Sequence, residues 1–122
     1  MARRRKKLSI KSGPTLAHRV RIQPAATAVA QAHAAFIQER EQGPEAALKW
    51  LSGLFDVIES LSEMPNRFKV IDEQDAFDIQ LRQLLYFSHR VIYHVDEESR
   101  SVHVLRVYHS ARDHLDTADL DE

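Results

Sequence analysis

The sequence predicts an α+β domain in which an N-terminal strand and an α-helical hairpin pack on a small antiparallel sheet. Two observations predict this fold class. Apolar residues recur at helical spacing between residues 24 and 63, and from residue 79 onward they alternate as they do in strands. At 122 residues the chain has the length of one domain with a single core.

The first two predicted elements are a short strand and a helix. Val20 and Ile22 alternate with arginines, which predicts a half-buried strand over residues 18–23. Pro24 suits the first turn of a helix, where its missing N–H is not needed, and the helical pattern continues to about Glu41. The apolar face expected for this helix consists of Ala25, Val29, Ala32 and Phe36.

A second helix follows a break at Gly43 and Pro44. Glycine accepts a left-handed cap, and proline suits the first helical position. The helix should end before Met64, because Pro65 disfavours helical geometry in the residue that precedes it. Its expected apolar face consists of Ala47, Trp50, Leu51, Leu54, Ile58 and Leu61. The two helices therefore form an antiparallel hairpin.

A loop and three strands complete the domain. The loop over residues 67–78 is polar and is anchored by Phe68, Val70, Ile71 and Phe77. The strands are predicted over residues 79–87, 90–95 and 102–108, with short polar separators at 88–89 and 96–101. Strands joined in this way form an antiparallel meander. The side of the middle strand with Val91, Tyr93 and Val95 should meet the helices, which leaves the opposite face of the sheet open.

Charge is distributed unevenly along the chain. The net charge is −1, yet residues 1–21 contain eight basic and no acidic residues. Residues 1–17 are expected to form a disordered basic extension, residues 18–115 the folded domain, and residues 116–122 an acidic tail. The basic extension fits either contacts with nucleic-acid phosphates or a solubilising role, and both interpretations stay open.

The composition excludes several functional classes. Without cysteine the chain has no disulfide scaffold, zinc finger or thiol nucleophile. Three glycines argue against a phosphate-binding loop, and His103 and His109 lack the neighbouring ligands of a metal site. No cofactor or metal is therefore expected. Because no apolar run approaches a membrane span and no signal peptide follows the basic start, we expect a cytoplasmic protein without membrane contact.

Three stretches of the sequence carry a resemblance to a known family. They are RVRIQPAA, GPEAALKWLSGLFDVIESLSEMPNRF and LRQLLYFSHRVIYHVDEESRSVHVLRVYHSARDHL, within residues 18–115. Together with the order of elements, they resemble the RelE/ParE superfamily of toxins from bacterial type II toxin–antitoxin modules, which are also known as plasmid stabilisation systems. The segment VLRVYHSARD is most similar to the ParE-like branch.

The resemblance implies a toxin that is neutralised by a cognate antitoxin. ParE-like members inhibit DNA gyrase by binding, and this is the function that we expect. RelE-like members are ribosome-dependent endonucleases that cleave mRNA, which is the alternative. An inactive relative that only binds its antitoxin is a third interpretation. Fold alone does not choose between these mechanisms, so whether the chain is an enzyme stays open.

The candidate site residues lie in the predicted sheet and directly after it. If the protein is a nuclease, His109 is the candidate acid or base, because histidine titrates near neutral pH. The residues expected to bind the target or the antitoxin are Arg82, Arg90, Arg106, Tyr108 and Arg112. Two departures from RelE-like nucleases argue against cleavage: residues 78–85 contain a single cation, Arg82, and Ser110 replaces the tyrosine that some relatives have. In the structural alternative, His109 and Arg112 cap the sheet edge and bind the acidic tail.

Overall fold

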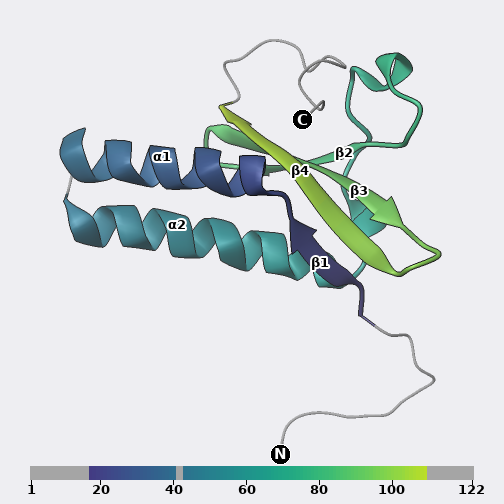
Figure 1. Ribbon diagram of the computed structural model, residues 1–122, viewed down its shortest axis with the longest axis horizontal. Helices are drawn as coiled ribbons and strands as arrows, with labels where there is room; N and C mark the ends of the chain where they lie inside the picture. Colours follow the sequence, from purple (N-terminus) through teal and green to yellow (C-terminus); the bar gives the residue numbers. More distant parts are fainter. Residues whose placement is uncertain (1–16, 41–42, 110–122) are drawn as a thin grey trace, which may run out of the picture.

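The computed structural model describes residues 17–40 and 43–109, which form a helical layer and a sheet (Figure 1). Helices α1 (Pro24–Arg40) and α2 (Pro44–Glu59) run side by side. The four strands are β1 (Arg19–Ile22), β2 (Arg82–Tyr86), β3 (His89–Asp96) and β4 (Ser101–His109). The predicted α+β fold class, with a helical hairpin packed on a small sheet, is confirmed.

The sheet has the strand order β1-β4-β3-β2. Strands β2, β3 and β4 form the predicted antiparallel meander. Strand β1 pairs with β4 in parallel, so the complete sheet is mixed. In this order β4 and β3 are the two central strands, and β1 and β2 are the edge strands.

Helix α1 buries a different face from the one that the sequence predicts. The buried residues are Ala26, Ala30, Ala34 and Ile37. Val29 and Phe36 of the predicted face are 38% and 45% exposed, so this prediction is wrong. Alanines four residues apart form a smooth stripe, which lets the helix approach β4 and α2 more closely than a stripe with Val29 and Phe36 would.

Helix α2 supplies the large side chains of the core, as predicted. Leu54 and Ile58 are fully buried against Val91 and Tyr93 of β3. Gly43, with a φ of +82°, precedes the helix at a conformation that glycine readily adopts. The helix ends at Glu59, and a 3-10 turn over Ser60–Ser62 follows it before Met64. The face of the sheet that meets the helices therefore forms the main core.

The opposite face of the sheet, which we call the back face, is only partly open. Residues 69–81, which we call the strap, run along it and bring Ile71, Phe77 and Leu81 against Ile92. The expectation of an open face is therefore wrong where the strap lies, because its apolar anchors find buried partners on β3. These residues form the back cluster, which also includes Leu105 and Tyr108.

Two expectations about the ends of the chain concern residues that the structure does not describe. Of the predicted basic extension over residues 1–17, only Ala17 is among the described residues. The predicted acidic tail over residues 116–122 lies outside them, as does Arg112.

Candidate functional site

Three of the predicted site residues share the back face of the sheet. In the register of β3 and β4, Arg90 lies opposite Tyr108, and Arg106 lies opposite Ile92. Residues directly opposite each other project their side chains to the same face. Because Ile92 belongs to the back cluster, Arg90, Arg106 and Tyr108 all project away from the helices.

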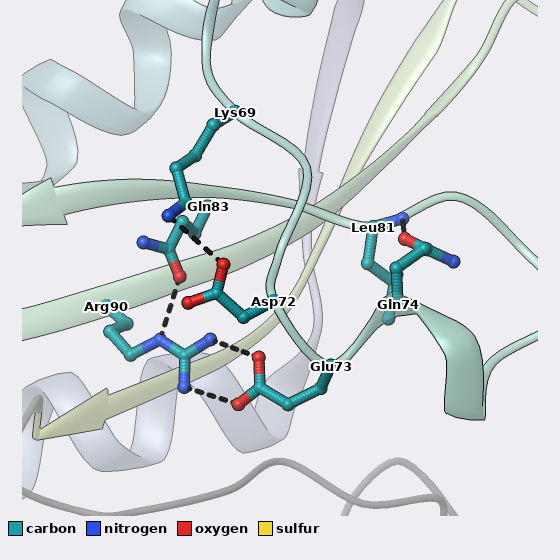
Figure 2. Close-up of polar contacts among 7 residues, drawn as sticks. All are labelled: Lys69, Asp72, Glu73, Gln74, Leu81, Gln83 and Arg90. Atoms are coloured by element: carbon teal, nitrogen blue, oxygen red, sulfur yellow. Dashed lines mark hydrogen bonds and ion pairs between the residues drawn. The ribbon is translucent and has the colours of Figure 1, made fainter.

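The guanidinium of Arg90 is bound to the strap. Its Nη1 and Nη2 donate to the two carboxylate oxygens of Glu73 at 3.1 and 3.0 Å, and its Nε donates to Gln83 Oε1 at 3.0 Å (Figure 2). The side chains of Arg90 and Glu73 are only 11% and 8% exposed. This is a buried, bidentate ion pair in which each partner compensates the charge of the other.

Arg82 projects to the other face of the sheet. It lies opposite Tyr93, whose ring is part of the main core. Its Nη1 donates to the Phe68 carbonyl at 2.6 Å, and its Nη2 donates to Gln80 Oε1 at 3.0 Å. The structure therefore separates Arg82 from Arg90 and Arg106.

His109, the candidate acid or base, also projects to the helix side. It lies opposite His89, and their ring centroids are 5.2 Å apart. The ring of His89 is 4.4 Å from His33 on α1 and 5.2 Å from Trp50 on α2. We call His33, His89 and His109 the histidine cluster; it lies where the hairpin meets the ends of β3 and β4.

His89 is the buried member of this cluster. Its side chain is nearly inaccessible, and burial, followed by the neighbouring His33 and His109, lowers the pKa of His89 from 6.5 to about 4. Within the described part of the chain its Nδ1 has no hydrogen-bond partner. His89 is therefore neutral near pH 7, and a proton on it would be an uncompensated buried charge.

Two apolar grooves flank the histidine cluster. The first, which we call the α1 groove, has a volume of 370 Å³ and lies between α1 and the end of β4. Val29, Ala32 and Phe36 line it from the helix, and Val107 and His109 line it from the strand. The apolar residues that α1 turns away from the core therefore form one wall of a groove.

The second groove, which we call the hairpin groove, has a volume of 760 Å³ and lies between α2 and the β2–β3 turn. Trp50, Tyr86 and Phe87 line it, and the Tyr86 hydroxyl donates to the Trp50 carbonyl at 2.8 Å. Phe87 is 80% exposed and adopts a φ of +51°, a conformation that is strained for a bulky residue. Strain of this kind occurs preferentially at functional sites.

The two grooves, and the separation of His109 from Arg90 across the sheet, are the main features of this arrangement. RNA cleavage requires an acid or base and phosphate-binding cations around one substrate, but His109 and Arg90 project to opposite faces. No group of three or more potential ligand side chains that could hold a metal ion is found within residues 17–40 and 43–109. Neither α1 nor α2 is both long and apolar enough to cross a membrane, among the residues that the structure describes.

Both the sequence and the fold of this chain are similar to those of known proteins. A family model described as the ParE toxin of the type II toxin-antitoxin system parDE matches residues 20–114. The archaeal RelE–RelB complex from Pyrococcus horikoshii OT3 contains a chain of similar fold, with a TM-score of 0.55 and 20% identity, over 80% of this chain and 100% of that one. A chain of the toxin–antitoxin complex RelBE2 from Mycobacterium tuberculosis is similar at a TM-score of 0.52 and 19% identity, over 83% and 100%. No curated protein matches the sequence.

Proposed function

The chain belongs to the ParE toxin family of type II toxin–antitoxin systems, within the RelE/ParE superfamily, and from this membership we propose that it inhibits DNA gyrase by binding. We also propose that a cognate antitoxin neutralises it. The antitoxin is supported by the two solved structures of similar fold, since both are toxin–antitoxin complexes.

The separation of His109 from the arginines supports binding over cleavage. His109 lies on the helix side of the sheet, whereas Arg90 and Arg106 lie on the back face. Arg90 is already paired with the Glu73 carboxylate. A phosphate beside Arg90 would therefore meet a guanidinium whose charge is compensated, and it would lie across the sheet from His109, the candidate acid or base.

The two grooves support a protein as the binding partner. Val29 and Phe36 beside the α1 groove and Phe87 beside the hairpin groove are large, exposed apolar side chains. Grooves of this kind accept the apolar face of a helix or the side chains of an extended segment. We propose that the antitoxin inserts apolar side chains into the α1 groove and places acidic side chains near Arg82 and Arg106.

Controlled expression in bacteria tests the mechanism. DNA supercoiling and mRNA cleavage are followed in parallel for the parent chain, for His109→Ala, and for a control, His103→Ala, which changes a histidine on the same strand but outside the cluster. If the protein inhibits gyrase, supercoiling falls. His109→Ala then removes at most one contact, worth about 1 kcal/mol, so toxicity survives at higher expression.

The nuclease alternative gives a different result in the same experiment. Toxicity and mRNA cleavage would fall about a hundredfold or more in His109→Ala, as expected for the loss of an acid–base catalyst, and His103→Ala would remain toxic. Melting temperatures of the purified variants show whether each still folds. Ribosome-dependent cleavage by the parent chain, abolished in a folded His109→Ala, would refute gyrase inhibition as the mechanism.

Copurification tests the antitoxin surface. The protein is coexpressed with the product of a neighbouring antitoxin-type reading frame, and Phe36→Asp is compared with Leu48→Asp. Both residues are exposed, but Phe36 lines the α1 groove and Leu48 does not. The complex should be lost with Phe36→Asp and retained with Leu48→Asp. Equal retention with both variants would show that the antitoxin does not use the α1 groove.

A further inference from the structure

The two ends of the strap pair with each other beside the start of β2, through a bridge between Val70 and Arg82. The Ile71 N–H donates to the Leu81 carbonyl and the Gln83 N–H donates to the Lys69 carbonyl, each at 3.0 Å. The Leu81 N–H also donates to Gln74 Oε1 at 2.7 Å (Figure 2). These bonds close the strap into a loop at the start of β2, and the contacts of Ile71 and Leu81 with Ile92 place this loop over the back face.

Glu73 is the acidic residue that the strap turns inward. Asp72, Asp75 and Asp78 of the strap are exposed, and the side chain of Asp72 is 87% exposed against 8% for Glu73. Asp72 pairs with Lys69 in solvent, whereas Glu73 points at Arg90 (Figure 2). Burial of a carboxylate is costly unless a cation compensates it, so Glu73 and Arg90 depend on each other.

The geometry of this pair is the one with which arginine also binds phosphate. A guanidinium donates two parallel hydrogen bonds to a carboxylate or to a phosphate in the same bidentate geometry. Arg106 and Tyr108 project to the same face as Arg90. The back face therefore combines donors that suit a nucleic-acid backbone with an internal carboxylate bound to one of them.

We propose that Glu73 determines the specificity of the back face: its carboxylate occupies the place on Arg90 that a nucleic-acid phosphate would take, and so prevents this face from binding nucleic acid. This inference rests on the proposed function, a toxin that binds a protein target, and supplies a physical reason why this chain would bind a protein rather than RNA. Glu73 also repels an approaching phosphate by its charge.

The test measures binding of single-stranded RNA and DNA by the purified full chain. Labelled oligouridylate and oligothymidylate of twelve nucleotides are titrated, with fluorescence anisotropy as the readout, into the parent and into Glu73→Gln. This change keeps the shape of the side chain and removes its charge. We expect Glu73→Gln to bind both strands at least tenfold more tightly than the parent, with about one more counterion released, because one further phosphate contact forms.

Asp72→Asn is the matched control, because it changes the net charge equally on the same strap but at an exposed position. It should change the affinity less than twofold. The double variant Glu73→Gln/Arg90→Gln should lose the gain. Equal gains in Glu73→Gln and Asp72→Asn, a gain that persists without Arg90, or a gain for only one of the two strands would overturn the proposal.

A second variant keeps the test decisive if Glu73→Gln does not fold. Glu73→Asp retains the charge but shortens the side chain by one methylene, which weakens the two hydrogen bonds between the carboxylate and Arg90. It should bind both strands more tightly than the parent and less tightly than Glu73→Gln would. No gain in folded Glu73→Asp would overturn the proposal in that case. These titrations contain no gyrase, so their failure is distinguishable from a failure of gyrase inhibition.

Discussion

Replacing His89 by phenylalanine should remove a large part of the acid sensitivity of folding. In the folded chain, burial and the neighbouring His33 and His109 lower the pKa of His89 to about 4, against about 6.5 for an unperturbed histidine. Between these two values the unfolded chain binds a proton that the folded chain does not. The stability contributed by the neutral ring is therefore complete above pH 6.5 and is lost as the pH falls toward 4.

The size of this effect follows from the same two pKa values. Each pH unit of difference between folded and unfolded pKa corresponds to about 1.4 kcal/mol. Integrated from pH 7.5 down to pH 5, the linkage amounts to about 2 kcal/mol of lost stability. Phenylalanine keeps a ring against His33, Trp50 and His109 but takes up no proton, so the variant should lose about 2 kcal/mol less than the parent over this range.

Urea unfolding at pH 7.5 and pH 5 measures the difference, with the fluorescence of Trp50, the single tryptophan, as the signal. The comparison of interest is the change in unfolding free energy between the two pH values, so a general loss of stability in the variant does not affect it. His103→Gln, outside the cluster, should lose as much stability as the parent. Equal acid losses in the parent and in His89→Phe would refute this account of the cluster.

Three further substitutions test the packing by urea unfolding. Tyr93→Phe removes the bond from the buried hydroxyl to the Pro65 carbonyl at 2.5 Å and should cost about 1 kcal/mol; an unchanged unfolding free energy would contradict the contribution of this bond. Gly53→Ala should destabilise the protein by about 1–3 kcal/mol despite the helix propensity of alanine, because the new methyl would collide with the Tyr86 hydroxyl; Tyr86→Phe in the same chain should recover part of the loss. Leu54→Ala leaves a cavity at a fully buried position and should lower the unfolding free energy by about 2–5 kcal/mol. Leu48→Ala, at an exposed position, should lower it by less than about 0.5 kcal/mol. Similar losses in the two variants would contradict the assignment of the core.

The order of elements could be predicted from the sequence because it depends on periodicity. The change from helical spacing to alternation separates α2 from the sheet, and the alternation of Val91 and Tyr93 with Ile92 identifies the two faces of β3. The buried face of α1 could not be predicted in this way. Alanine is only weakly apolar, so Val29 and Phe36 dominate the pattern, although close packing against β4 favours the alanine stripe.

The candidate site was less accessible to prediction. The turn between β2 and β3 lies at residues 87–88, one residue before the predicted separator, so His89 belongs to β3 and lies opposite His109. A shift of one residue in a strand assignment hides such a partner. The pairing of Glu73 with Arg90 joins an aperiodic loop to a strand, and periodicity gives no signal for it. The binding roles of the arginines and of Tyr108 stay predictions.

The parallel pairing of β1 with β4 affects when the protein becomes folded during its synthesis. Arg19 pairs with Ser101, so β1 has no partner strand until the ribosome has added a further 82 residues. At about 5–20 residues per second, translation takes roughly 4 to 16 s to cover this distance. Throughout that interval the face of α1 that packs on β4 has no strand to cover it. The nascent toxin therefore passes through a period in which its sheet is incomplete, and the proposed antitoxin, if already present, has that period to encounter the chain before its fold is complete.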